Sequence, residues 1–260
     1  MYETSTEKPV NLFWTGGWDS TFRLLQLVLE ENRVVQPYYI ICQARVSYKN
    51  ELQAMEEIRA LIIKEFPLKG SLILPTKMTN LEDIIEDIDI TDAYNKVNEK
   101  KPFGYQYAWL AWFCKQNGID DMELAFERNR VVTDSYPFQD HIIPKDKSGI
   151  YVIDPINAEP AEYTLFKHFL FPIYAYTKLD IRKLVRQKGW WKFQKKTWFC
   201  FTPIHGKIPC GTCRPCRLSI SENRGWGIPL YIRVLNALSL TGPIRMIMHH
   251  FLLFLKKEKE

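Results

Sequence analysis

The chain has 260 residues, enough to bury one α/β core, and hydrophobic residues make up 46% of it. Charged residues make up 25%, a share that argues against disordered and membrane-embedded proteins. The net charge of +5 is modest, so it favours small anionic ligands without requiring nucleic acid. Six cysteines without a secretory signal predict a reducing environment, and we therefore expect a cytoplasmic protein.

Strand-like and helix-like segments alternate along the chain. This order predicts an α/β fold with a parallel sheet and crossover helices. Short apolar runs predict strands over 10–14, 34–42, 71–74 and 122–126. Apolar residues at intervals of three and four predict helices over 50–66 and 104–116.

A glycine loop follows the first predicted strand and precedes a helical run over 22–29; it reads Thr15-Gly16-Gly17-Trp18-Asp19-Ser20-Thr21. The two glycines lack the Cβ that would keep an anion away from backbone N–H groups. Ser20 and Thr21 add hydroxyl donors at a helix N-terminus, whose partial positive charge favours phosphate. The loop therefore predicts a phosphate-binding site. The alternative is a plain strand-to-helix turn with Asp19 or Ser20 as its N-cap.

Four cysteines form a second motif. Cys200 precedes three cysteines that are separated by two residues each, Cys210, Cys213 and Cys216. Four thiolates close a tetrahedral zinc shell, and this spacing lets successive sulfurs converge on one ion. We therefore expect a structural zinc site, with an iron–sulfur cluster and a disulfide pair as alternatives.

The two motifs together resemble a known family. The loop is similar to the S-G-G-x-D-S loop of the PP-loop ATP pyrophosphatases, with Thr15 in place of the first serine. The loop and the late cysteines resemble the 7-cyano-7-deazaguanine synthase family of queuosine biosynthesis. The segment 171–181 is similar to that family's Lys-bearing helix start, and 197–200 to its entry to the zinc site. The resemblance extends from about Val10 to Arg217.

This resemblance implies an ATP-dependent ligase that forms C–N bonds. Such an enzyme activates a deazaguanine-like carboxylate, releases pyrophosphate and AMP, and transfers the acid to a nitrogen nucleophile. It implies that Asp19, Ser20 and Lys178 are catalytic, with Lys178 neutralising charge at the α-phosphate. ATP would be bound by the whole loop, Thr15, Gly16, Gly17, Trp18, Asp19, Ser20 and Thr21. Mg²⁺ would bridge the phosphate oxygens, and the four cysteines would hold Zn²⁺.

The middle of the chain departs from the family pattern. The family carries a Pro-x-Arg-Asn segment and a Tyr-Pro-Asp-Cys loop that shape the nucleobase pocket. Here the corresponding regions read Ala125-Phe126-Glu127-Arg128-Asn129-Arg130 and Asp134-Ser135-Tyr136-Pro137-Phe138. The activated acid and its acceptor therefore stay open. Relatives in prokaryotic defence islands join a deazaguanine to a protein amine in place of ammonia. A non-enzymatic zinc-knuckle RNA-binding module is a further alternative, which the weak net basicity disfavours.

We expect three parts along the chain: a PP-loop ATP-binding domain over 1–196, a zinc-binding segment over 197–224 and a helical extension over 225–260. The extension is strongly apolar between Trp226 and Leu255. Neither of its halves reaches the ~20 uninterrupted apolar residues of a membrane span. We expect it to pack on the enzyme's own core or to form a homodimer or protein-partner surface, with interfacial membrane contact as the alternative.

Overall fold

The computed structural model describes residues 8–128, 136–221 and 227–237. Contacts divide the chain into two compact units. Unit 1 comprises Met1–Gln43 and Glu51–Thr197, and unit 2 comprises Ala44–Asn50 and Trp198–Glu260. Of the apolar extension expected over 225–260, the structure describes 227–237, and the rest lies outside the described residues.

Unit 1 contains the strands and most of the helices. Its strands are β1 (Val10–Phe13), β2 (Val35–Ile41), β3 (Lys77–Asn80), β4 (Met122–Glu123), β5 (Ile142–Pro144), β6 (Tyr151–Ile153) and β7 (Phe169–Leu170). Its helices are α1 (Trp18–Leu25), α2 (Tyr48–Glu65, with its first turn in unit 2), α3 (Pro67–Gly70), α4 (Ile88–Lys100), α5 (Gln106–Gln116), α6 (Pro160–Phe166), α7 (Lys178–Gln187) and α8 (Trp191–Gln194).

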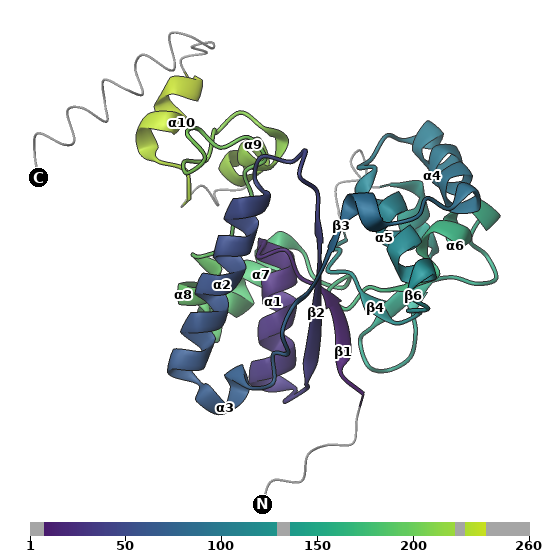
Figure 1. The fold of residues 1–260 in the computed structure, drawn as a ribbon, viewed down its shortest axis with the longest axis horizontal. Coiled ribbons are helices and arrows are strands. Elements are labelled where there is room, and N and C mark those ends of the chain that lie inside the picture. The colour runs from purple at the N-terminus through teal and green to yellow at the C-terminus, as the bar shows by residue number, and fades with distance from the viewer. Residues whose placement is uncertain (1–7, 129–135, 222–226, 238–260) are drawn as a thin grey trace, which may run out of the picture. The chain divides into compact units, whose positions relative to one another are not determined.

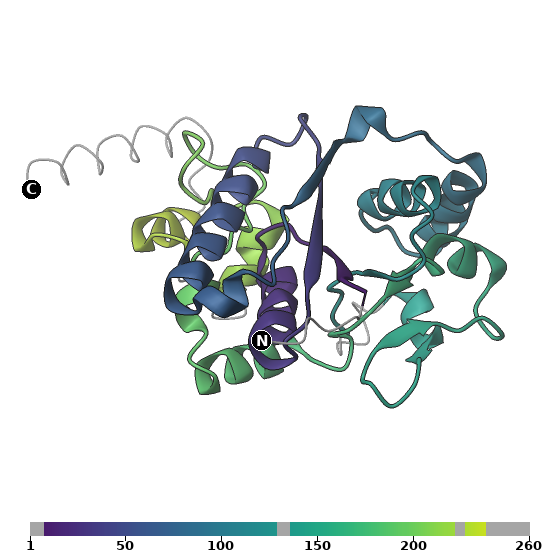
Figure 2. The same cartoon turned by 60° about the horizontal axis from the view of Figure 1, so that its bottom comes forward.

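The sheet of unit 1 has five strands, all parallel, in the order β3-β2-β1-β4-β7. Strands β5 and β6 form a separate antiparallel pair. Helices α1, α2, α7 and α8 lie on one side of the strands, and α4, α5 and α6 lie on the other (Figure 1), as the turned view in Figure 2 also shows. Helices on both sides are what a parallel sheet requires. The predicted α/β class with a parallel sheet is therefore confirmed.

Aromatic side chains fill much of the unit 1 core. The ring of Phe13 on β1 lies 5.7 Å from that of Phe113 on α5, measured between centroids. The rings of Phe138 and Phe166 are 4.5 Å apart. Such pairs add about 0.5–1.5 kcal/mol each to the stabilisation by buried area. These contacts join β1 to α5 and the segment around Phe138 to α6.

The third strand was predicted in the wrong place. The expected segment 71–74 makes only a single parallel bridge, between Ile73 and Val35. Pro75 then follows, and proline has no N–H to donate to a neighbouring strand. Regular pairing resumes after it, where Lys77 on β3 faces Tyr38 on β2.

Two other boundaries differ from the prediction. Strand β4 ends at Glu123, although the N–H of Leu124 still donates to the Leu170 carbonyl at 2.9 Å. Helix α1 begins at Trp18, four residues before the expected start. Its N-cap is Gly17, whose backbone is extended (φ −81°, ψ 170°) and which has no side chain to cap the helix. The interpretation of Asp19 or Ser20 as the N-cap is therefore wrong.

Unit 2 is small and has little regular structure in its described part. It contains the first turn of α2 and the helices α9 (Arg214–Ser221) and α10 (Leu230–Ala237). Its buried cluster consists of Cys200, Cys210, Cys216, Ile228 and Ile232. No helix in residues 8–128, 136–221 and 227–237 is long and apolar enough to cross a membrane.

Candidate functional site

The sheet of unit 1 has a topological switch point between β1 and β4. From β1 the chain proceeds outward on one side to β2 and β3, then returns to β4 on the other side of β1 and continues to β7. Ligands of open parallel sheets bind in the crevice outside the carboxyl ends of the strands where the order reverses. The glycine loop follows the carboxyl end of β1, so the fold places it at this position.

Local hydrogen bonds give the glycine loop a closed shape. The N–H of Thr15 donates to the Ser20 hydroxyl at 3.3 Å, and the two hydroxyl oxygens are 3.4 Å apart. Gly16 has a φ of +65°, which glycine adopts without strain. A Cβ at Gly16 would lie 2.9 Å from the Glu51 carbonyl oxygen of α2. Gly16 is therefore required by the packing of α2 as well as by the turn.

The Lys178 ammonium contacts one residue of the glycine loop and one residue that follows β4. Its ammonium forms an ion pair with Oδ2 of Asp19 and lies 2.9 Å from Oε1 of Glu127. The three side chains retain 20–28% of their exposure, so they are partly shielded from water. Asp19 follows β1, Glu127 follows β4 and Lys178 follows β7. Three neighbouring parallel strands thus each contribute one charged residue to the same place.

A capping box fixes the position of Lys178 at the start of α7. The Thr177 hydroxyl accepts from the Asp180 N–H at 3.2 Å, and Asp180 Oδ2 accepts from the Thr177 N–H at 2.9 Å. The reciprocal pair determines where the helix begins. Lys178 is therefore the first residue of α7 and reaches Asp19 and Glu127 from there.

The Asp19–Lys178–Glu127 group has the donor chemistry expected of a metal–phosphate site. Oδ1 of Asp19 is buried and has no hydrogen-bond partner in the part of the chain that the structure describes. Two carboxylates are ligands of the type that Mg²⁺ takes together with substrate phosphates, and an ammonium pairs with phosphate oxygens. The residues present therefore fit the predicted ATP and Mg²⁺.

Two residues of the predicted ATP-binding set, Trp18 and Thr21, have side chains that lie in the core. The hydroxyl of Thr21 accepts from the indole N–H of Trp14 at 3.1 Å, and Thr21 is fully buried. Trp18 packs edge-on against Trp191, with ring centroids 6.0 Å apart, and is 6% exposed. These side chains hold α1 in place, whereas the side chains of Thr15, Asp19 and Ser20 make their contacts within the loop or with Lys178.

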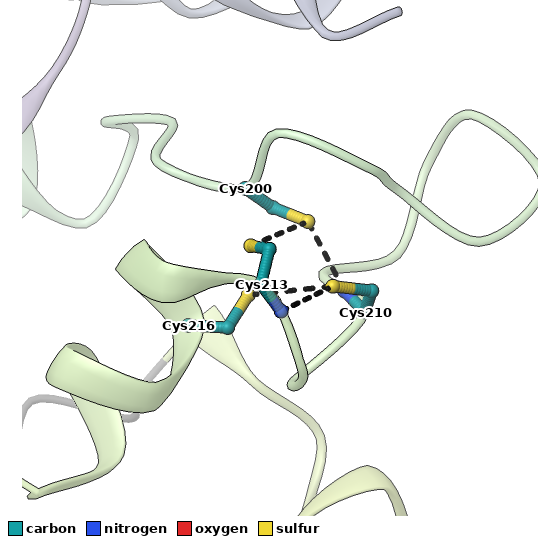
Figure 3. Close-up of side chains that lie close together, drawn as sticks. All are labelled: Cys200, Cys210, Cys213 and Cys216. Carbon is teal, nitrogen blue, oxygen red and sulfur yellow. Dashed lines mark hydrogen bonds between the residues drawn. The ribbon is translucent and has the colours of Figure 1, made fainter. Parts of the chain in front are cut away.

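The four predicted metal ligands converge in unit 2. Their sulfur atoms all lie within 4.8 Å of one another and point toward a common centre (Figure 3). The Sγ–Sγ distance is 3.9 Å both for Cys210–Cys216 and for Cys213–Cys200. A tetrahedral ion with Zn–S bonds of about 2.3 Å requires an Sγ–Sγ separation of about 3.8 Å. The cluster therefore could hold one metal ion such as zinc.

The same distances test the alternatives. A disulfide requires an S–S distance of about 2.05 Å, and all six cysteines are free thiols. An iron–sulfur cluster places several irons and sulfides between its cysteines, for which sulfurs within 4.8 Å leave no room. A single ion therefore fits best.

Backbone and hydroxyl donors around the sulfurs favour the thiolate form. The sulfur of Cys210 accepts from the N–H groups of Thr212 at 3.4 Å and Cys213 at 3.3 Å, and from the Thr202 hydroxyl at 3.3 Å. Hydrogen bonding to Cys200 lowers the pKa of Cys210 and lowers that of Cys213 to about 6, whereas hydrogen bonding to Cys210 raises the pKa of Cys200 and hydrogen bonding to Cys200 raises that of Cys216. Hydrogen bonds to a charged form stabilise it. Metal ligation requires this deprotonated state.

Comparison of the chain with protein-family models, with curated proteins and with solved structures gives no match. The assignment of a function therefore rests on the residues and their geometry.

Sequence reasoning missed Glu127 as a member of the site. A usable signal exists, because Glu127 follows a predicted strand that becomes the neighbour of β1. The segment that contains Glu127 matches the family pattern only in fragments, so the resemblance does not point to it. The guanidinium carbon of the next residue, Arg128, lies 6.0 Å from the centroid of the Tyr174 ring.

Proposed function

We propose that unit 1 is an ATP-dependent adenylating ligase of the PP-loop type. The observation that carries the proposal is the Asp19–Lys178–Glu127 group beside a glycine loop at the switch point of a parallel sheet. The resemblance of the loop and cysteines to 7-cyano-7-deazaguanine synthases supports a deazaguanine-like carboxylate as the acid. We extend the proposal to a zinc ion in the four-cysteine site, with a structural role because four thiolates leave no open position.

The reaction consists of two substitutions. A carboxylate oxygen of the acid attacks the α-phosphorus of ATP, the bond from that phosphorus to the bridging oxygen breaks, and pyrophosphate leaves. A nitrogen nucleophile then attacks the acyl carbon, loses a proton and displaces AMP. Mg²⁺, when bound with ATP, would supply charge neutralisation at the phosphate oxygens. Asp19 and Glu127 would hold that ion.

The chain's own residues contribute positioning and charge. Lys178 would exchange a carboxylate partner for a phosphate oxygen and so stabilise the negative charge that develops at the α-phosphate. Ser20 and Thr15 would donate hydroxyl hydrogens to the pyrophosphate, in place of their contact with each other. N–H groups in the first turn of α1 lack helical acceptors and favour the same anion.

The products of the reaction test this proposal. Purified chain is incubated with ATP, Mg²⁺ and a deazaguanine carboxylate, with ammonium or with candidate acceptor proteins, and nucleotides are quantified by chromatography. We expect AMP and pyrophosphate in equal amounts; ADP as the main product would contradict the proposal. Mass spectrometry of the acid and of the proteins then distinguishes ammonia from a protein amine as the acceptor.

Substitutions in the glycine loop test whether its side chains contribute to the proposed activity. Asp19→Ala and Ser20→Ala should reduce turnover roughly tenfold to a thousandfold, the range for loss of a charge-stabilising contact. Asp92→Ala, an exposed aspartate on α4, is the matched control and should leave turnover unchanged. Wild-type turnover in both loop variants would mean that the loop is only a turn.

A further inference from the structure

Basic residues are unevenly divided between the two units. Unit 2 has eleven lysines and arginines against three aspartates and glutamates, whereas unit 1 has 24 against 27. The positive excess of the chain therefore belongs entirely to unit 2. The described part of unit 2 contains no aspartate or glutamate, and its basic residues are Arg45, Lys49, Lys207, Arg214, Arg217 and Arg233. A zinc ion with four thiolates carries about −2, so the excess remains positive.

Two of these cations lie on neighbouring segments. The side-chain amide of Asn50 donates to the Gly206 carbonyl at 2.8 Å. Lys49 and Lys207 adjoin these two residues in sequence, and both are exposed. This hydrogen bond places the turn at Gly206, within the segment that carries the cysteines, beside Asn50, although the two residues are 156 positions apart in the sequence.

Two further cations lie on the helices α9 and α10 of unit 2. Arg217 is exposed on α9 and follows the predicted metal ligand Cys216. Arg233 is exposed on α10, one turn before Asn236, whose side-chain amide donates to the Gly211 carbonyl at 2.6 Å. Both cations are therefore anchored to the segment that carries the cysteines.

An exposed aromatic ring lies beside one of the basic residues of unit 2, Arg45. Phe201 directly follows the predicted metal ligand Cys200 and is 43% exposed. The guanidinium carbon of Arg45 lies 5.1 Å from the centroid of its ring. Rings and guanidinium planes both stack on nucleobases, and stacking contributes about 1–3 kcal/mol per base.

We propose that unit 2 binds single-stranded nucleic acid. Its lysines and arginines would contact phosphates, and Phe201 with Arg45 would stack on an unpaired base. Exposed cations together with an exposed aromatic ring are the combination that proteins use to bind single strands. An acidic peptide or an anionic membrane would use the charge, but neither presents a flat base on which the ring and the guanidinium can stack. This inference is independent of the proposed ligase activity, because it concerns unit 2 alone.

Fluorescence anisotropy with the full zinc-loaded chain tests the proposal. The probes are labelled 20-nucleotide RNA and DNA single strands of mixed sequence, titrated at several KCl concentrations. The test variant carries Lys49→Gln, Lys207→Gln, Arg217→Gln and Arg233→Gln. We expect its affinity to fall at least tenfold. The slope of log K against log salt should shrink by about 3, since each lost contact with a single strand contributes about 0.7.

A matched variant controls for net charge. Lys64→Gln, Lys96→Gln, Lys147→Gln and Lys195→Gln remove four exposed lysines from unit 1. This variant should bind within twofold of the wild type. Phe201→Leu should weaken binding about tenfold without changing the salt slope, because it removes stacking and no charge. Zinc content and melting temperature of every variant confirm that the fold is retained.

Three outcomes would overturn the inference. The first is no binding of either strand at 50 mM KCl. The second is an equal loss of affinity in the unit 1 control, which would reduce the effect to net charge. The third is equal or tighter binding of a polyglutamate peptide or of phosphatidylserine vesicles. A preference for RNA over DNA, or the reverse, supports the proposal and identifies the sugar that is recognised.

Discussion

Unit 1 and unit 2 are stabilised by different means. The buried cluster of unit 1 is large and consists of aliphatic and aromatic side chains from its strands and helices. In the described part of unit 2 the buried cluster consists of five residues, and Cys200, Cys210 and Cys216 are three of them. A metal site is a common means of stabilising a small domain whose core is built around cysteines. The two units should therefore respond differently to loss of the metal and to changes in the apolar core.

Removal of the proposed zinc ion should have the largest effect, and only on unit 2. Apparent binding free energies of structural zinc in small domains are about 10–16 kcal/mol, and this energy is folding energy. Chelation, or the substitution Cys213→Ser, should lower metal content and make the 198–237 segment sensitive to protease. Residues 51–128 and 136–197 of unit 1 should stay protected. Limited proteolysis with mass spectrometry measures both, and loss of protection throughout the chain would contradict separate stabilisation.

A buried ion pair should matter most for unit 1. Arg23 and Glu123 form two hydrogen bonds, of 2.8 and 2.9 Å, and their side chains are 7% and 2% exposed. Glu123→Leu would leave the buried Arg23 with its second carboxylate partner, Glu31, which is 41% exposed, so we expect the lower end of the usual cost, about 3 kcal/mol in the free energy of unfolding. The double variant Arg23→Met with Glu123→Leu should recover most of this loss. Urea denaturation of the three variants measures the effect; a double variant as unstable as the single one would argue against it.

Replacement of Lys178 separates the chemistry of unit 1 from its stability. Lys178→Met should lower the rate of pyrophosphate release about 10²–10³-fold, because a positioned charge at the α-phosphate is lost. Lys183→Met, an exposed residue of the same helix, should have no effect. Steady-state kinetics should show the loss mainly in kcat. A loss confined to KM would instead mean that Lys178 only binds ATP in the ground state.

The sequence predicted more of unit 1 than of unit 2. Parallel strands buried on both faces are continuous apolar runs, so the segments around β1 and β2 were recognisable. The strand β3, Lys-Met-Thr-Asn, is largely polar and could not be recognised in this way. In unit 2 the cysteine spacing predicted the metal site, but nothing predicted that Ala44–Asn50 joins it. That contact depends on hydrogen bonds such as Asn50 to Gly206, which leave no periodic pattern.

The candidate site of unit 1 was predictable only as far as the loop. Asp19 and Lys178 were named from local motifs, and their ion pair joins residues 159 positions apart. Trp18 and Thr21 belong to the same motif, yet they face the core because α1 begins four residues earlier than expected. The direction of a side chain on a helix depends on where the helix starts. A loop motif therefore identifies the region of a site, and the fold decides which of its side chains reach the ligand.

The smallest effect that we predict is the pH dependence of a single hydrogen bond in unit 1. The Tyr174 hydroxyl donates to the Gln139 carbonyl at 2.6 Å, and burial raises the pKa of Tyr174 to about 12. An unfolded tyrosine has a pKa of about 10. Because the folded pKa is the higher one, the bond's contribution is complete below about pH 10 and is lost as the pH rises toward 12.

Tyr174→Phe should therefore lower the free energy of unfolding by about 1 kcal/mol at pH 8, and the difference from wild type should shrink by pH 11. Tyr163→Phe, at a position that is 39% exposed, should leave stability unchanged at both pH values. Urea denaturation at the two pH values measures this, and a difference that stays constant would show that the hydroxyl keeps its proton at pH 11 in both states.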